Sequence, residues 1–110
     1  LALAACGPRY VRRPPVRGRT ERGTLTDGRA SLHSLSADAG DTLVVEIVEG
    51  TGAVQFTIRD PLGRVVYDSA TAPGRLQRFA GTATTGGTHA VYVTPRGGGT
   101  VRYAIELGTA

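Results

Sequence analysis

The chain has 110 residues, enough for one ordinary domain, and its single cysteine excludes an intrachain disulfide and a thiolate metal cluster. The net charge of +4 is unevenly distributed: residues 1–22 hold six arginines and one acid, whereas residues 23–110 hold seven arginines and eight acids. The globular part is therefore close to neutral, which argues against a nucleic-acid-binding domain.

The chain begins with an apolar segment, Leu1–Ala5, that ends at Cys6. Leu3-Ala4-Ala5-Cys6 resembles the lipobox of bacterial lipoproteins, in which a leucine and two small residues precede the cysteine. The resemblance implies that residues 1–5 are the end of a signal peptide and that Cys6 is acylated, which would anchor the protein to a lipid bilayer. The alternative is a buried structural cysteine in a short helix, but Gly7-Pro8 would break such a helix.

Residues 6–23 are rich in arginine and proline, with Pro14-Pro15 near the centre. Adjacent prolines favour extended polyproline II structure, and like charges repel one another along the chain. We therefore predict that residues 6–23 are a linker and that the folded domain spans residues 24–110.

Apolar and polar residues alternate through most of this domain. Val54, Phe56 and Ile58, for example, are separated by single polar residues, and Asp60-Pro61-Leu62-Gly63 then has the composition of a type I turn. Short strands with one apolar face predict an all-β fold, an antiparallel β-sandwich or β-barrel of about eight strands. The strands are expected at about 19–25, 30–36, 42–49, 53–59, 64–68, 75–80, 88–94 and 100–107.

The motifs between Arg29 and Leu107 occur in a characteristic order. Ala39-Gly40 precedes an apolar strand, Asp60-Pro61-Leu62-Gly63 ends the next, Gly87-Thr88 precedes a Val-rich strand, and Tyr103 lies in the last. This order resembles the bacterial pre-peptidase C-terminal domain. The resemblance implies a jelly-roll-like β-sandwich that serves as a non-catalytic accessory domain of secreted proteins.

The chain departs from that family in three respects. His89 stands where a tyrosine is usual, and His33 stands where another aromatic residue is usual. Some relatives bind Ca²⁺ through acidic residues of the N-terminal linker, but this linker has only Glu21, which cannot supply the about six to eight oxygen ligands that calcium takes. We therefore predict no metal site and no cofactor.

Few residues suggest catalysis. His33 and His89 fall on apolar strand faces, where replacement of a core aromatic is the simpler interpretation, and two histidines are too few to hold zinc. Serine, histidine and aspartate occur together in Ser31–Asp38, but His33 and Ser34 should point to opposite faces of one strand. We therefore predict that the protein is not an enzyme.

A row of polar residues is the candidate for binding. Gln55, Thr57 and Arg59 should lie on the outward face of one strand, with Tyr92 or Tyr67 beside them. Such a face would suit a protein or a cell-wall glycan as the ligand.

We therefore predict a lipid-anchored lipoprotein of the bacterial cell envelope, in the periplasm or at the cell surface, that presents a non-catalytic β-sandwich binding module. The alternatives are a carbohydrate- or peptidoglycan-binding module, an inhibitor of a cell-wall hydrolase and a structural envelope subunit. We predict no nucleic-acid partner.

Overall fold

The computed structural model describes residues 17–26, 28–71 and 77–110, and these residues form eight strands and no helix. The all-β expectation is confirmed, and only β7 begins more than two residues from its expected position. The strands are β2 (Arg17–Leu25), β3 (Ser31–Ala37), β4 (Thr42–Glu49), β5 (Val54–Arg59), β6 (Val65–Asp68), β7 (Arg78–Thr82), β8 (Gly87–Pro95) and β9 (Val101–Thr109).

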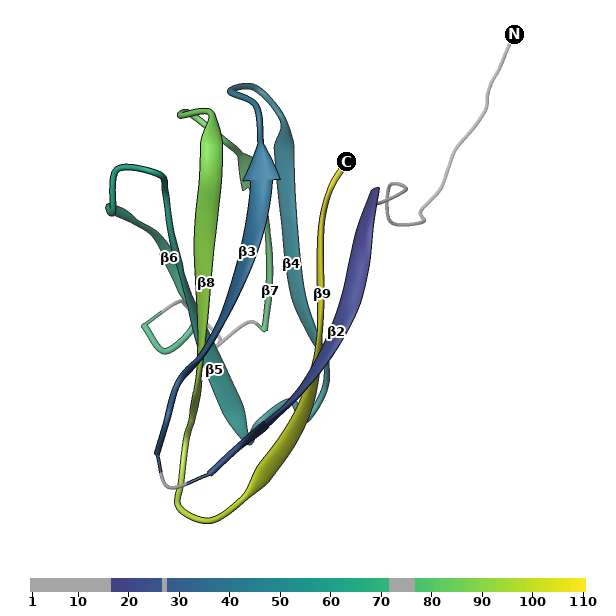
Figure 1. The fold of residues 1–110 in the computed structure, drawn as a ribbon, viewed down its shortest axis with the longest axis vertical. Helices are drawn as coiled ribbons and strands as arrows, with labels where there is room; N and C mark the ends of the chain where they lie inside the picture. Colours follow the sequence, from purple (N-terminus) through teal and green to yellow (C-terminus); the bar gives the residue numbers. More distant parts are fainter. Residues whose placement is uncertain (1–16, 27, 72–76) are drawn as a thin grey trace, which may run out of the picture.

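Two four-stranded antiparallel sheets pack face to face (Figure 1). One sheet has the strand order β2-β9-β4-β7 and the other has the order β3-β8-β5-β6. The pairing is nested, because β2 pairs with β9, β3 with β8, β4 with β7 and β5 with β6. This is a long antiparallel hairpin rolled into two layers, so the expected jelly-roll-like sandwich is confirmed.

The core lies between the two sheets, because alternate residues of each strand point inward. Phe56 is fully buried and pairs with Val93, and Ile58 pairs with Val91 on the neighbouring strand. After β5 the chain turns back at Asp60, whose carbonyl accepts a hydrogen bond from the Gly63 N–H at 2.9 Å. The local alternation and the turn chemistry thus operate as the sequence predicts.

The boundary that we predicted at residue 23 is wrong. Residues 17–23, expected as the end of the linker, belong to β2, which pairs with β9 from Arg17 to Leu25. The strand expected at about 19–25 is present, but its inward positions include Arg19, Glu21 and Gly23, so no apolar face marks residues 17–23 as part of the folded domain. Cys6 and residues 6–16 of the predicted linker lie outside the described residues.

The predicted confinement of positive charge to a tail is corrected for the same reason. Arg19 and Arg22 are part of the sheet, where they form ion pairs with Glu21 and Glu49 respectively. None of the described residues belongs to a helix long and apolar enough to cross a membrane.

Side chains close the two open sides of the sandwich. On one side the ring of Tyr67 on β6 packs against that of Phe79 on β7, with 5.0 Å between the ring centroids. On the other side polar side chains of β2, β3 and β9 meet. The surfaces left for a partner are the outer sheet faces, the sheet edges and the two ends.

Candidate functional site

The outer face of the β3-β8-β5-β6 sheet carries the four residues predicted for binding. Thr57 on β5 pairs directly with Tyr92 on β8, and Gln55 and Arg59 lie on the same side of β5. The sheet therefore brings together the residues that the alternation selected. Tyr67, the other aromatic residue considered, packs inward against Phe56, with 5.5 Å between the ring centroids.

Sequence reasoning missed Leu32, which extends this face. Leu32 on β3 pairs with Tyr92 from the side opposite Thr57, and it is 61% exposed. Its position next to the inward His33 was the signal that could have identified it, because neighbours on a strand face opposite ways. Leu32, Tyr92 and Thr57 form a continuous row across three strands.

Two charged residues flank Thr57 on this face: Arg59 follows it on β5, and Asp68 on β6 pairs with it from the side opposite Tyr92. Arg59 Nη1 donates to the Gly63 carbonyl at 2.7 Å, which holds the guanidinium beside the β5–β6 turn. The remaining row of leucine, tyrosine and threonine offers contact to an apolar surface or a sugar ring. That this face binds a ligand stays a prediction.

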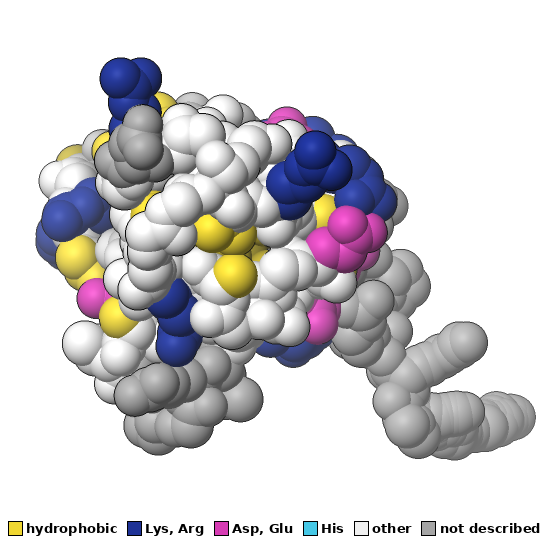
Figure 2. All heavy atoms as spheres, turned by 90° about the horizontal axis from the view of Figure 1, so that it is seen from below, with side chains coloured by type: hydrophobic (Ala, Val, Ile, Leu, Met, Phe, Trp, Pro, Cys, Tyr) yellow, Lys and Arg dark blue, Asp and Glu magenta, His cyan; other side chains and the backbone are white. Residues whose placement is uncertain are grey.

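A second candidate lies at the end of the sandwich where the β2–β3, β4–β5 and β8–β9 connections meet (Figure 1). Arginine side chains surround this end, with acidic groups beside them (Figure 2). We call it the arginine end and define it by Arg22, Arg29, Arg96 and Arg102. A pocket of about 360 Å³ opens here, lined by Arg22, Gly23, Thr24, Glu49, Arg102 and Tyr103.

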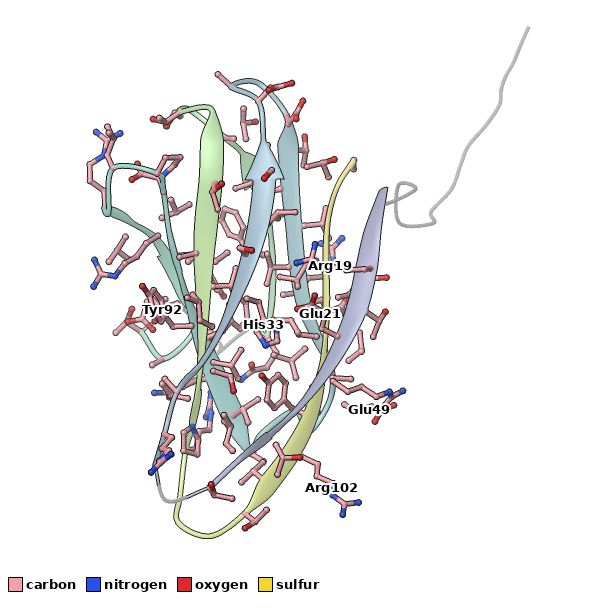
Figure 3. All side chains as sticks on the ribbon, viewed as in Figure 1. Arg19, Glu21, His33, Glu49, Tyr92 and Arg102 are labelled. Atoms are coloured by element: carbon pink, nitrogen blue, oxygen red, sulfur yellow. The ribbon has the colours of Figure 1, made fainter. Side chains whose placement is uncertain are left out.

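One arginine of this pocket is paired and one is not. Arg22 Nη1 lies 2.5 Å from Glu49 Oε1, and this hydrogen bond lowers the pKa of Glu49 and raises that of Arg22. The Arg102 side chain is exposed beyond Glu49 (Figure 3), and its guanidinium makes no hydrogen bond or ion pair with another described residue. The pocket therefore presents a guanidinium that can donate hydrogen bonds to the carboxylate of a partner.

Polar side chains close the open side between β2 and β3 (Figure 3). His33 Nδ1 lies 2.5 Å from Glu21 Oε1, and His33 Nε2 lies 2.6 Å from the Tyr103 hydroxyl. Burial raises the pKa of Tyr103, so this hydroxyl stays protonated at neutral pH. A neutral His33 protonated on Nδ1 satisfies both bonds, because it donates to Glu21 and accepts from Tyr103.

Arg19 completes this network from the same strand as Glu21. Its Nε donates to the Glu21 carboxylate at 2.5 Å, and its Nη2 donates to the backbone carbonyl of Ser34 on β3. The network therefore ties the first strand of one sheet to the edge of the other. The His33 ring lies edge-on to the ring of Tyr103, with 5.7 Å between the ring centroids.

The described part of the chain assembles neither the serine–histidine–aspartate triad nor the histidine metal site considered from the sequence. His33 points inward and Ser34 outward on β3, so the serine and histidine of a triad face opposite ways. His89 is 1% exposed on the inward face of β8, and its Nδ1 lies 3.2 Å from the Gly87 carbonyl. Among the described residues no group of three or more His, Cys, Asp or Glu could hold a metal ion.

The network predicts a specific acid sensitivity. Hydrogen bonds from Arg19 and then from His33 lower the pKa of Glu21 below its ordinary value of 4.5. Such a carboxyl stabilises the fold above its unfolded pKa, and this stabilisation is lost as the pH falls through the lower folded pKa. We expect the melting temperature to fall below about pH 4.5, and to fall less steeply in Glu21→Gln, as measured by scanning calorimetry.

Glu49→Gln is the matched control for this experiment. Its carboxylate also pairs with an arginine, but both partners are more than half exposed, so the pair contributes little. The fall in melting temperature at acid pH should be nearly the same in Glu49→Gln as in the wild type. If the melting temperature of Glu21→Gln fell as steeply at acid pH as that of the wild type, protonation of Glu21 would not be linked to folding.

Sequence comparisons with known proteins find no match, whereas comparison with solved structures finds proteins of the same fold. No protein-family model matches the chain, and no curated protein matches its sequence, so the resemblance to the pre-peptidase C-terminal domain stays a prediction. The structure of PliG from Aeromonas hydrophila, a periplasmic inhibitor of g-type lysozyme, is similar with a TM-score of 0.73 and 18% identity. The match covers 91% of this chain and 93% of that chain.

Two further inhibitors of g-type lysozyme have the same architecture. PliG of Salmonella Typhimurium matches with a TM-score of 0.65, and a mutant PliG of Escherichia coli matches with 0.64. Each is 13% identical, and each match covers 92% of this chain and 95% of the other. At these identities the likeness shows a shared fold.

Proposed function

We propose that this protein is a non-catalytic inhibitor of a cell-wall hydrolase of the lysozyme type, acting in the bacterial cell envelope. The observation that carries the proposal is the likeness to three periplasmic lysozyme inhibitors over more than nine-tenths of each chain. An inhibitor was one of the alternatives raised by the sequence, and the structural neighbours favour it over the broader description of a binding module.

The arginine end is the surface that best fits such a partner. Enzymes that hydrolyse glycosidic bonds commonly place two carboxyl groups beside the bond they cleave. A protein that blocks the cleft therefore benefits from cationic donors on a projecting surface. Arg102 supplies an unpaired guanidinium here, whereas the charge of the neighbouring Arg22 is balanced by Glu49.

The proposal is tested by lysis of a bacterial cell-wall suspension. Purified protein is titrated against g-type lysozyme, and against lysozymes of other types in parallel, while the fall in turbidity is followed. We expect saturable inhibition that reaches completion near one inhibitor per enzyme. The proposal is refuted if no lysozyme is slowed at any excess of the protein.

Charge reversal at the arginine end gives the sharper prediction. Arg102→Glu should raise the concentration needed for half-maximal inhibition by about tenfold or more, because a like-charge contact replaces an attractive one. Arg59→Glu is the matched control, since it makes the same charge change at the β5–β6 turn. If Arg59→Glu weakened inhibition more than Arg102→Glu, the enzyme would instead contact the sheet face that carries Tyr92.

A second candidate function rests on the row of Leu32, Tyr92 and Thr57. Binding of cell-wall glycan would make the protein sediment with insoluble peptidoglycan, and Tyr92→Ala would release it. An inhibitor that contacts only the enzyme would not sediment in either form.

Anchoring through acylated Cys6 is a separate proposal, which fatty-acid labelling of the wild type and of Cys6→Ser would test.

A further inference from the structure

A pocket of about 280 Å³ opens between the two sheets, on the side that Tyr67 and Phe79 close. Val65 and Val66, which precede Tyr67 on β6, line one wall, and Ala83, which follows β7, lines the other. None of the described residues lines both this pocket and the pocket at the arginine end. The two pockets are therefore separate sites.

A β-bulge on β6 gives the pocket an apolar wall. Arg59 pairs with Val65 and Ile58 pairs with Tyr67, so Val66 is the extra residue between the two pairs. Neighbours on a regular strand point to opposite faces, whereas both valines line this pocket. Val65 is 53% exposed and Val66 is 37% exposed, so the wall is accessible from solvent.

The pocket also contains a hydrogen-bond acceptor. His89 on β8 lines the pocket although it is only 1% exposed. Its Nδ1 lies 3.2 Å from the Gly87 carbonyl, which can only accept, so Nδ1 carries the proton and Nε2 a lone pair. Among the described residues, the side-chain atoms that are enclosed without a partner are Gln77 Oε1 and Arg78 Nε, so the unbonded Nε2 is open to the pocket.

The charged groups beside this acceptor balance one another. Asp60 Oδ2 accepts from Arg64 Nε at 3.0 Å, and Asp60 Oδ1 accepts from two backbone N–H groups of the turn at 2.9 Å. Arg64 Nη2 donates to Thr85 at 3.2 Å, and its Nη1 bonds no other described residue. Thr82 and Thr84 add hydroxyl groups to the lining. The pocket therefore offers both donors and an acceptor without a net charge.

We propose that this pocket binds a single neutral sugar ring, a pyranose. An anion would meet the Asp60 carboxylate and the His89 lone pair, and a cation would meet the Arg64 guanidinium. One sugar hydroxyl can donate to His89 Nε2 while another accepts from Arg64 Nη1, and the C–H groups of the ring can lie on the valines. Pockets for drug-sized ligands have about 300–1,000 Å³, so the volume here suits one ring.

Chemical-shift mapping of the ¹⁵N-labelled full chain tests the proposal, with glucose, galactose and N-acetylglucosamine as the probes. We expect saturable shifts with dissociation constants of about 0.1–10 mM, as befits a small ligand in an open pocket. The shifts should centre on Val65, Val66, Ala83 and His89, and the unprotonated ring nitrogen of His89 should move upfield as it accepts a hydrogen bond. Absence of saturable shifts with all three sugars, or shifts centred on Tyr92, would overturn the proposal.

A longer probe identifies the source of the sugar ring. The tetramer of N-acetylglucosamine is titrated in parallel with the monosaccharide. Shifts of the same pocket residues by the tetramer would assign the end of a glycan chain as the ligand. Shifts by the monosaccharide alone would assign a free sugar.

His89→Phe tests the role of the acceptor. The variant keeps a ring of similar size but leaves the sugar hydroxyl without its partner, so the affinity should fall by about tenfold. Tyr92→Ala is the control, because it removes a ring from the outer sheet face and should bind the sugars like the wild type. Unchanged affinity in His89→Phe, or equal losses in both variants, would refute the assignment.

The mapping of the wild type decides the proposal even if His89→Phe does not fold. None of these measurements involves lysozyme, so failure of the sugar site and failure of the proposed function are recognised separately.

Discussion

Replacement of Phe56 by alanine will destabilise the fold by about 3–5 kcal/mol. Phe56 is fully buried between the sheets, and its ring lies 5.5 Å from that of Tyr67. Tyr67 in turn packs on Phe79, so the cavity would open within the aromatic cluster that closes one side of the sandwich. The lost stability has two parts: the free energy gained by burying the ring away from water, and the contacts missing around the cavity that its removal leaves.

Urea denaturation measures this effect, and Thr57→Ala is its matched control. Thr57 neighbours Phe56 on β5 but points to the outer face, opposite Tyr92. Its truncation should cost under about 0.5 kcal/mol, as most surface changes do. Similar losses in the two variants would contradict the assignment of inward and outward positions on β5.

Replacement of Gly50 by alanine will destabilise the protein by about 2–5 kcal/mol. Gly50 has a φ of +80°, a left-handed conformation that an L-residue adopts only at a cost. An added Cβ would also lie 2.6 Å from the Arg102 carbonyl oxygen and 3.2 Å from the Tyr103 Cα. These are backbone atoms of β9, so relief requires the loop or the strand to move.

Gly52→Ala separates the two causes. Gly52 lies in the same connection with a φ of +90°, but an added Cβ there would meet nothing within 4 Å. It should therefore lose only about 1–2 kcal/mol, the cost of the backbone conformation. Equal losses at Gly50 and Gly52 in thermal or urea unfolding would mean that the steric contact with β9 is absent.

Local chemistry explains why the strands could be predicted. The alternation through β4, β5, β8 and β9 and the turn at Asp60 depend on neighbours in the chain, so the sequence identifies both the strands and their inward faces. The same local rule selected Gln55, Thr57, Arg59 and Tyr92 as outward residues. It did not place residues 17–23 inside the folded domain, although a strand was expected at about 19–25, because the inward residues Arg19, Glu21 and Gly23 have no apolar period.

The candidate sites beyond that face depend on pairings between distant segments. Arg22 meets Glu49 because β2 and β4 flank β9 in one sheet, and Arg102 joins them from β9 itself. His33 meets Glu21 and Tyr103 across the two sheets. No local pattern specifies these neighbours, since the residues lie far apart in the chain.

The sequence by itself thus determined the all-β class, the positions of most strands and which side of β4, β5, β8 and β9 faces the core, because burial alternates with the local period of the backbone. Only the tertiary structure decided which strands are neighbours and which edges are left open. The nested pairing places the first strand beside the last and leaves β6 at a sheet edge. The arginine end, the Glu21–His33–Tyr103 network and the pocket beside β6 all follow from that long-range antiparallel pairing.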